Sequence, residues 1–306
     1  MTQVHEEVPA ALDGQRIDRV VAMLTGVSRT EATDLVRHGG VTVDGAAATR
    51  GADRLQVGQM VVIDVPDPVA AELPEPDATV VIPVVFADEH VVVIDKPADL
   101  VVHPGAGHRH GTLVSGLLAR YPDIVGVGEP ERPGVVHRLD RGTSGLLMVA
   151  RSALAYESLV GQLSARTVDR RYRTLVWGHP DSPRGLIEAP IGRSPKHPTK
   201  MAVTSNGKEA RTRYEVEQLF TAPSPTAVLT CRLETGRTHQ IRVHLSAIGH
   251  PVVGDDRYNG VRQTVPTLRP FLHAEQLGFD HPVTAERLVF DSPLPSDLVA
   301  VLAALG

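Results

Sequence analysis

The chain has 306 residues, 42% hydrophobic and 22% charged, and carries a formal net charge of −5 at pH 7. This composition predicts a soluble globular protein and excludes one that binds nucleic acid through overall positive charge. No apolar run approaches the roughly 20 residues of a membrane-spanning helix. Residues 1–10 lack a secretory signal pattern, so we expect a cytoplasmic protein with no membrane partner. The single cysteine, Cys231, excludes an internal disulfide.

The N-terminal part predicts a loose tail over residues 1–13 and a small α/β module over residues 14–65. Apolar residues spaced along one helix face predict a first helix over residues 17–25. Ser28 and Glu31 form a capping box, which opens a second helix before the paired glycines that follow. Strand patterns come next, at residues 41–43 and, as a hairpin around a Gly-Gln turn, at residues 55–63.

Three short segments of this module have the wording of the S4 RNA-binding domain: Arg16-Ile17-Asp18, Ser28-Arg29 and Gly40-Val41-Thr42-Val43-Asp44-Gly45. The module resembles that domain, and the resemblance implies that the second helix presents Arg29, Arg37 and His38 to RNA. The alternative is an ordinary solvated helix face, because the charges of the module are balanced.

Residues 66–82 are acidic and rich in proline, which predicts an extended linker and a domain boundary. The remaining residues, 83–306, predict one larger domain. Helices are expected after Thr112 and after Ser152, each an N-cap residue. Strand patterns occur at residues 84–86, 91–94, 100–102, 146–149, 172–177, 228–233 and 287–290. Strands outnumber helices and come in clusters, which favours an α+β fold with a mixed, largely antiparallel sheet flanked by helices.

The first candidate site is the run His137-Arg138-Leu139-Asp140-Arg141-Gly142-Thr143-Ser144-Gly145, which leads into an apolar strand. Asp140 stands between two arginines at the start of that strand. The arginines favour its charged form whereas burial disfavours it. Such a carboxylate can be a nucleophile or a base; the alternative is an ordinary salt-bridged aspartate. Residues 131–173 carry eight arginines against four acidic residues, which suits a phosphate-bearing partner.

The second element covers residues 235–245. Thr238 is expected to cap a helix whose buried stripe is Ile241, Leu245 and Ile248 and which ends at the following glycine. Arg242 lies next to this stripe. A buried arginine needs a carboxylate partner, and Asp140 is the candidate.

The third element is Arg170-Arg171-Tyr172-Arg173-Thr174-Leu175-Val176. Strand alternation is expected to place Tyr172, Thr174 and Val176 on one face and the arginines on the other. An inward tyrosine at such a site can stack on a base, or it can be part of the core.

Other patterns do not predict a site. The glycine-rich segments lack the dinucleotide-binding spacing, so no nucleotide cofactor is expected. His103, His108 and His110 have no cysteine or acidic ligands at metal-binding spacing, so no metal is expected. The pair Asp255-Asp256 is interpreted as turn chemistry.

Together and in this order, the three elements resemble the RluA/RluD family of pseudouridine synthases. Further segments match sequence motifs of the family: Lys96-Pro97, His103-Pro104-Gly105, Gly111-Thr112-Leu113, Gly254-Asp255 and Leu272-His273-Ala274. The resemblance covers residues 80–295. It implies a catalytic domain that converts uridine to pseudouridine in RNA, most plausibly large-subunit ribosomal RNA, without cofactor or metal and as a monomer.

The resemblance also implies residue roles. Asp140 would be the nucleophile, attacking C1′ of the sugar or C6 of the base. Tyr172 would stack on the uracil and act in the proton step, and Arg242 would pair with Asp140. Arg138 would enter the RNA stack as the target flips out. Further RNA contacts are expected from neighbouring residues: Arg141, Thr143, Arg237, His239 and Gln240.

Two positions depart from the family's pattern: Gly142, commonly Asp, and Asp99, commonly Gly. Asp99 is expected in a turn with left-handed backbone. Two other functions stay open. An RNA-binding or ribosome-assembly factor that has lost catalysis would have no chemical reason to keep Asp140, Tyr172 and Arg242 together. A nucleoside hydrolase would release free uracil.

Overall fold

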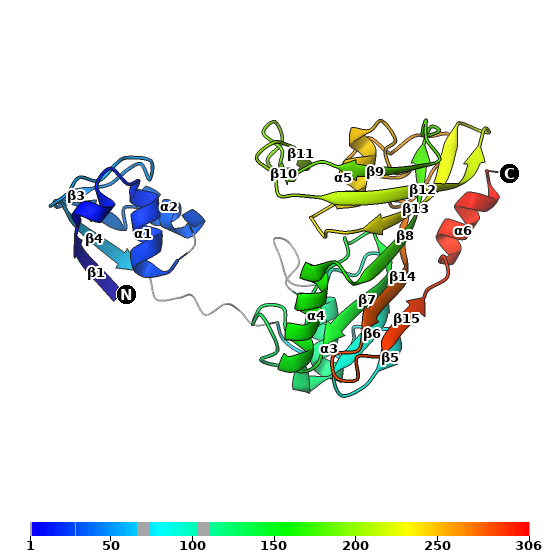
Figure 1. Ribbon diagram of the computed structural model, residues 1–306, viewed down its shortest axis with the longest axis horizontal. Helices are drawn as coiled ribbons and strands as arrows, with labels where there is room; N and C mark the ends of the chain where they lie inside the picture. The colour runs from blue at the N-terminus through cyan, green and yellow to red at the C-terminus, as the bar shows by residue number, and fades with distance from the viewer. Residues whose placement is uncertain (1, 28, 66–73, 103–109, 306) are drawn as a thin grey trace. The chain divides into compact units, whose positions relative to one another are not determined.

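The computed structural model describes residues 2–27, 29–65, 74–102 and 110–305. The chain divides into two compact units, Met1–Ala71 and Glu72–Gly306 (Figure 1). The division lies within the expected linker. Each unit has its own hydrophobic core, so each is described by itself.

The smaller unit is a four-stranded sheet with strand order β1-β4-β2-β3 and two helices. Its elements are β1 (Thr2–Glu7), α1 (Ile17–Thr25), α2 (Arg29–Arg37), β2 (Val41–Val43), β3 (Ala46–Ala47) and β4 (Met60–Val65). Both helices lie where the apolar spacing predicts them, and Gly26 ends α1 with φ +74°. Ser28, the expected cap of α2, lies outside the described residues. Val21, Val36 and Ile63 belong to the core between helices and sheet.

Two expectations for this unit are wrong. Residues 1–13 are not a loose tail, because β1 pairs antiparallel with β4 from Thr2–Val65 to Glu7–Met60. This strand is largely exposed and polar, so it has no apolar alternation to predict it. Residues 55–57 do not pair with β4 as a hairpin either. Instead β4 is a central strand between β1 and β2, and Leu55 is buried in the core.

The larger unit contains a nine-stranded sheet with order β5-β6-β7-β14-β8-β13-β12-β9, and β15 pairs with β14. The strands are β5 (Val84–Ala87), β6 (Val91–Lys96), β7 (Ser144–Ala150), β8 (Asp169–Trp177), β9 (Arg184–Glu188), β12 (Arg211–Phe220), β13 (Thr226–Leu233), β14 (Leu272–Asp280) and β15 (Arg287–Asp291), with β10 (Ile191–Arg193) and β11 (Met201–Val203) in a separate hairpin. Within the nine-stranded sheet β14 and β7 are parallel and the other pairs antiparallel. The predicted α+β fold with a mixed, largely antiparallel sheet is confirmed.

Helices cover both faces of this sheet: α3 (Leu113–Arg120), α4 (Ala153–Ala165), α5 (Gln240–Ala247) and α6 (Ser296–Ala303). Strand β7 is buried along its whole length because alternate side chains enter two cores. Leu147 packs with α3 and α5 on one face, and Met148 packs with α4 on the other. The expected caps are present: Thr112 and Ser152 accept N–H groups in the first turns of α3 and α4.

Two further expectations are corrected. Residues 100–102 are not a strand, because the carbonyls of Val101 and Val102 accept the N–H groups that open α3. The second half of the expected linker belongs to the larger unit. Ile82 is buried in its core, and a Cβ on Gly116 of α3 would lie 2.9 Å from Ile82. The apolar side chains of this second half of the linker therefore pack on α3.

Candidate active site

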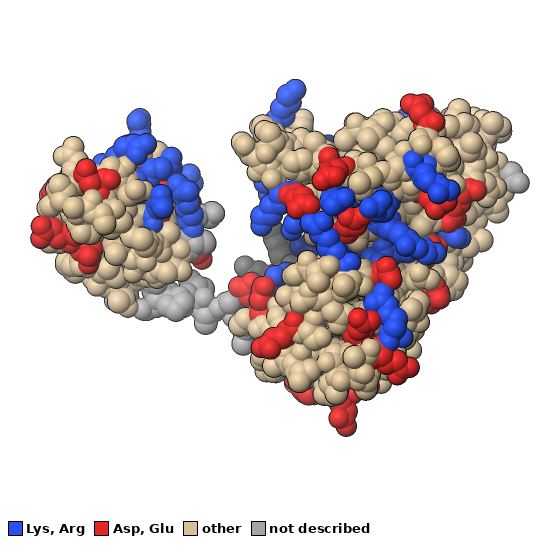
Figure 2. Space-filling view, in the orientation of Figure 1, with Lys and Arg blue, Asp and Glu red and all other residues tan. Residues whose placement is uncertain are grey.

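Lys and Arg side chains gather across the middle of the larger unit (Figure 2). Asp140 lies among them in a tight turn that precedes β7, where the N–H of Thr143 donates to the Asp140 carbonyl over 3.0 Å. The Asp140 side chain is 17% exposed, so it opens on a cavity and not on bulk solvent. The buried strand β7, which follows the turn, therefore fixes the position of this carboxylate.

Two buried basic side chains, Lys96 and Arg269, donate to main-chain carbonyls in the middle of this turn. Lys96 Nζ donates to the carbonyl of Arg141 over 3.3 Å and to those of Pro97 and Leu100 over 2.8 and 3.0 Å. Burial lowers the pKa of Lys96 to about 7, although the charge of Asp140 opposes the shift. The next carbonyl, that of Gly142, accepts from Arg269 Nη1 over 3.1 Å.

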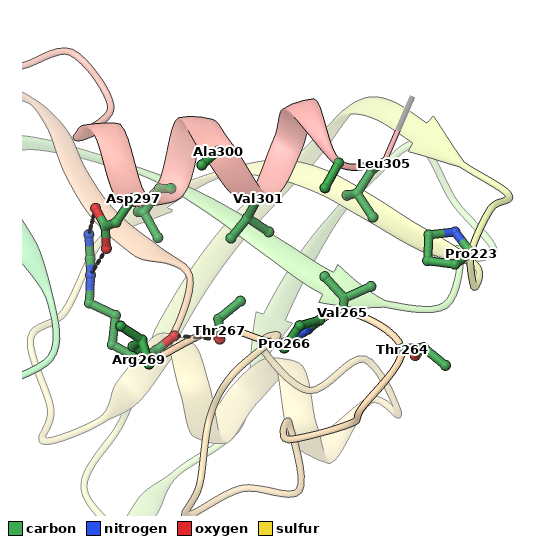
Figure 3. A pocket seen from close by; sticks show the side chains of 13 residues that line it. Pro223, Thr264, Val265, Pro266, Thr267, Arg269, Asp297, Ala300, Val301 and Leu305 are labelled. Carbon is green, nitrogen blue, oxygen red and sulfur yellow. Dashed lines mark hydrogen bonds and ion pairs between the residues drawn. The ribbon is translucent and has the colours of Figure 1, made fainter.

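Arg269 also ties the C-terminal helix to this turn. Its Nε and Nη2 donate to Asp297 over 2.6 and 3.0 Å, at one end of the pocket beside α6 (Figure 3). The guanidinium thus bridges α6 and Gly142. Sequence reasoning missed both Lys96 and Arg269 as supports, because their contacts with this turn are to main-chain carbonyls, which no side-chain motif reveals.

Arg269→Gln should destabilise the protein by about 1–3 kcal/mol, because a charged donor to Gly142 and the bidentate pair are both lost. Slower turnover is expected, because the turn that carries Asp140 is less rigid. Urea unfolding and single-turnover rates measure the two effects. Asp297→Asn is the matched control, since it weakens the pair but leaves Arg269 beside Gly142. Equal turnover loss in both variants would contradict a direct role of the Gly142 contact.

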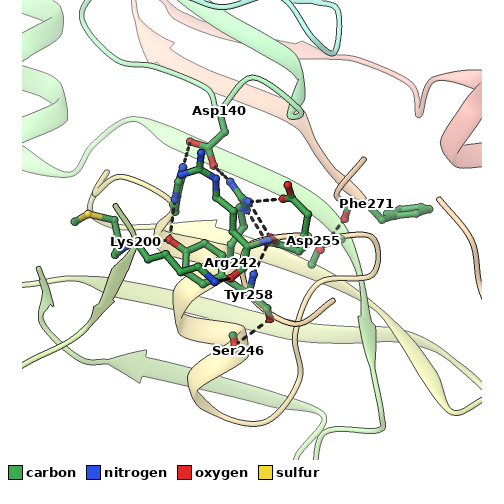
Figure 4. Close-up of polar contacts among 12 residues, drawn as sticks. Asp140, Lys200, Arg242, Ser246, Asp255, Tyr258 and Phe271 are labelled. Carbon is green, nitrogen blue, oxygen red and sulfur yellow. Dashed lines mark hydrogen bonds and ion pairs between the residues drawn. The ribbon is translucent and has the colours of Figure 1, made fainter. Parts of the chain in front are cut away.

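Arg242, on α5, joins two carboxylates (Figure 4). Its Nη1 lies 3.0 Å from Oδ2 of Asp140, so the expected ion pair is present. Its Nε and Nη2 donate to Asp255 over 2.6 and 2.8 Å. The hydrogen bonds with both carboxylates raise the pKa of Arg242 against the effect of burial, so it stays charged.

Asp255 was interpreted from the sequence as turn chemistry, which is only part of its role. It accepts the N–H groups of Arg257 and Tyr258, as a turn residue does, and it is fully buried against Arg242. The sequence feature that could have predicted a second carboxylate partner was Arg242 itself. A guanidinium has five N–H donors, more than one carboxylate can accept.

The start of α5 differs from expectation. His239, with φ +57°, is the N-cap, and Thr238 is not. No side chain caps the helix; the Gln240 Oε1 instead accepts the N–H of Arg237, in the loop before α5, over 3.0 Å. The expected burial of Ile248 is also wrong, because this residue follows the last residue of α5 and is 38% exposed. His239 Nε2 lies 3.9 Å from Asp140, and burial lowers the pKa of His239.

Tyr172 lies on β8 and lines the same cavity as Asp140. Burial raises the pKa of Tyr172 to about 12, so its hydroxyl is protonated at neutral pH. The expected separation of faces is wrong for Arg170, which shares the inward face with Tyr172 because the two are two residues apart on one strand.

The other expected RNA-binding residues divide into three groups. Five line the cavity around Asp140: Arg138, Thr143, Arg237, His239 and Gln240. The Gln240 amide, however, is occupied within the fold, donating to Arg211 and Thr212. Arg141 is not among the lining residues, being 57% exposed with Nε 3.7 Å from Asp99. In the smaller unit, Arg29 and Arg37 line a hollow between α2 and the start of α1, together with Arg16, Asp18 and Asp34.

The two departures from the family pattern are accommodated locally. Asp99 has φ +67°, the left-handed conformation expected for it. A Cβ at Gly142 would lie 3.1 Å from Pro270, so this position is tight but not closed.

The described part of the chain contains no group of three or more His, Cys, Asp or Glu side chains that could hold a metal ion. His103 and His108 of the histidine cluster lie outside it. Within the same residues, no helix is long and apolar enough to span a membrane.

Comparison with known proteins agrees with this geometry. Residues 90–247 match the model of the RNA pseudouridylate synthase family, and residues 15–61 match that of the S4 domain. The chain is 45% identical to a protein of Pseudomonas aeruginosa named ribosomal large subunit pseudouridine synthase D, over 100% of this chain and 96% of that one. It is 42% identical to an uncharacterized RNA pseudouridine synthase of Bacillus subtilis, over 100% and 99%. The solved structure of human RNA pseudouridylate synthase domain containing 1 is 31% identical, with a TM-score of 0.57, over 72% of this chain and 86% of that one.

Proposed function

We propose a specific reaction for this chain, which belongs to the RNA pseudouridylate synthase family: isomerisation of uridines to pseudouridine in large-subunit ribosomal RNA. The observation that carries the proposal is the set formed by Asp140, Arg242 and Tyr172 in one cavity. The substrate is supported by the name of the Pseudomonas relative, a ribosomal large subunit pseudouridine synthase, and by the S4 domain. Arg29 and Arg37 of that domain are proposed to contact the RNA.

In this proposal Asp140 is the nucleophile. If it attacks C1′, the N1–C1′ bond breaks and the uracil leaves as an anion that stays in the cavity. The base turns, C5 bonds to C1′, the carboxylate departs, C5 loses its proton and N1 gains one. If Asp140 attacks C6 instead, the adduct carries the base through the same exchange. Each route begins and ends with a free carboxylate, and neither consumes an oxidant, a reductant or water.

Arg242 keeps Asp140 oriented, because the buried Asp255 holds the other edge of the Arg242 guanidinium in place. A glycosidase-type hydrolysis would need a second carboxylate to activate water. Asp255 is held by Arg242 and cannot take that part. Arg138 lines the cavity, and its guanidinium makes no hydrogen bond or ion pair with the described part of the chain. It is therefore proposed to fill the space that the flipped uridine leaves in the RNA stack.

All three proposed catalytic residues come from one chain, which supports a monomer as the working unit. The balance of the reaction supports action without a nucleotide cofactor. A cytoplasmic location is proposed on the ground of the ribosomal substrate.

Tyr172→Phe tests the proton step. We expect turnover to fall about 10²-fold, the scale of a lost general acid–base group, while RNA affinity is unchanged because the ring is kept. Single-turnover assays and RNA titration measure the two quantities. Normal turnover in this variant would restrict Tyr172 to stacking.

The substrate is tested by incubating the wild-type protein with separate transcripts of large-subunit and small-subunit ribosomal RNA, followed by nucleoside analysis. Pseudouridine is expected in the large-subunit transcript. Its formation only in the other RNA would overturn the proposed substrate but leave the activity intact.

A further inference from the structure

Arg170 is a buried arginine that has no anionic partner within the described part of the chain. The residue is 7% exposed, and its guanidinium donates one long hydrogen bond within the described chain, 3.5 Å from Nη2 to the carbonyl of Leu233. Its Nε has no hydrogen-bond partner among the described residues. Burial lowers the pKa of Arg170, a sign that the charged form is poorly compensated.

Two other arginines of the same sheet, Arg173 and Arg211, also have an Nε without a hydrogen-bond partner among the described residues, but both lie beside carboxylates. Arg173 lies 3.2 Å from Glu217 and 3.1 Å from Glu275, and Arg211 lies 3.2 Å from Glu234. Burying a charge without a partner is costly, and proteins normally pair such groups. The arrangement around Arg170 therefore suits an anion that the protein itself does not supply.

The cavity that Arg170 lines has room for such an anion. It measures about 440 Å³ and adjoins the reaction site, sharing Asp140 and Tyr172 with it. Four further arginines line it: Arg132, Arg138, Arg166 and Arg237. Its acidic lining consists of Asp140 and Glu234, and Glu234 already pairs with two arginines of β12. Two of the lining arginines are likewise paired, Arg132 with Glu129 and Arg166 with Glu209. The remaining arginines, Arg138, Arg170 and Arg237, leave the cavity lining net positive.

Gly236 fits the same interpretation. A Cβ at this position would lie 3.0 Å from Arg170 Nη1, so glycine lets the guanidinium lie against the loop that leads to α5. The side chain of Arg237 is directed away through its Nε, which donates to the Glu209 carbonyl over 2.9 Å. Arg170 is thus the deepest cation of the cavity.

We propose that Arg170, beside Gly236, forms a subsite for the phosphodiester next to the target uridine. This inference rests on the proposed function. The cavity shares residues with the reaction site, so its occupant must be covalently close to the uridine. A phosphodiester is such a group; it is always ionised, and it accepts two parallel N–H bonds from one guanidinium. Binding of the RNA backbone at this subsite would thereby help to position the uracil base in the reaction site.

The first test compares Arg170→Gln with Arg171→Gln, a charge loss on the opposite face of the same strand. The measurement is the salt dependence of binding to large-subunit RNA, with Asp140→Asn in both proteins to prevent turnover. Loss of one phosphate contact should reduce the slope of log K against log salt by about 0.7 for single-stranded RNA. Only the Arg170 variant should show this. Equal slopes in both variants would overturn the proposal.

The second test uses short RNAs that the wild type converts, with one neutral methylphosphonate linkage placed 5′ or 3′ of the target uridine. Wild-type turnover should fall at least 10-fold for one of the two linkages, and Arg170→Gln should be insensitive to that linkage. Full wild-type activity with both modified RNAs would contradict the subsite.

Thermal unfolding separates this role from a structural one. Because Arg170 has no anion in the free protein, Arg170→Gln should not lower Tm, and inorganic phosphate should raise Tm in the wild type more than in the variant. A large drop in Tm would assign Arg170 to the fold. If the wild type forms no pseudouridine at all, the proposed function fails, whereas the salt slope still decides on the subsite because it requires binding alone.

Discussion

Asp140→Asn is expected to abolish pseudouridine formation, lowering the single-turnover rate by roughly 10⁴-fold or more, the scale of a lost nucleophile. An amide has the same shape as the carboxylate but cannot attack the sugar or the base. The fold should persist, because Arg242 keeps its bidentate contact with Asp255. Rates on RNA, RNA affinity and thermal unfolding measure the three properties.

The matched control for this variant is Asp256→Asn, which removes one negative charge from an exposed neighbour 4.0 Å from Arg242. We expect that variant to retain most of its activity. Substantial turnover by Asp140→Asn, with a verified sequence, would remove Asp140 from the role of nucleophile.

Arg242→Met is expected to cause the largest loss of stability, about 3–5 kcal/mol, the cost of breaking a buried ion pair from one side. The fully buried Asp255 would lose its cation, and Asp140 would lose its orienting partner. Urea unfolding measures the free energy, and activity should be lost as well.

A double variant makes this prediction specific. Arg242→Met with Asp255→Asn no longer buries an unpaired charge there, so it should recover part of the stability that the single variant loses. It should not recover activity, because Asp140 remains without its arginine. Additive stability losses would argue against direct coupling between Arg242 and Asp255.

The sequence predicted well those elements whose signal is local. The caps Thr112 and Ser152 and the apolar run Leu146–Ala150 of β7 define their elements through neighbours in the chain. By contrast, β1 is a polar edge strand whose pairing with β4 bridges a gap of more than fifty residues. Segments whose structure depends on a distant partner have no periodicity of their own, as residues 55–57 illustrate.

The site was predictable to a similar extent. A buried arginine required a carboxylate, and that requirement led from Arg242 to Asp140. It did not lead to Asp255, because the same carboxylate serves a turn and the arginine together. The error over Arg170 arose from grouping three arginines together, where strand alternation separates the first from the other two.

The central claim is that Asp140 drives isomerisation and not hydrolysis. The most direct measurement is nucleoside and free-base analysis of uridine-labelled large-subunit RNA after incubation with the wild type and with Asp140→Asn. We predict pseudouridine without free uracil from the wild type and neither product from the variant. Free uracil from the wild type, or pseudouridine from the variant, would contradict the proposed mechanism.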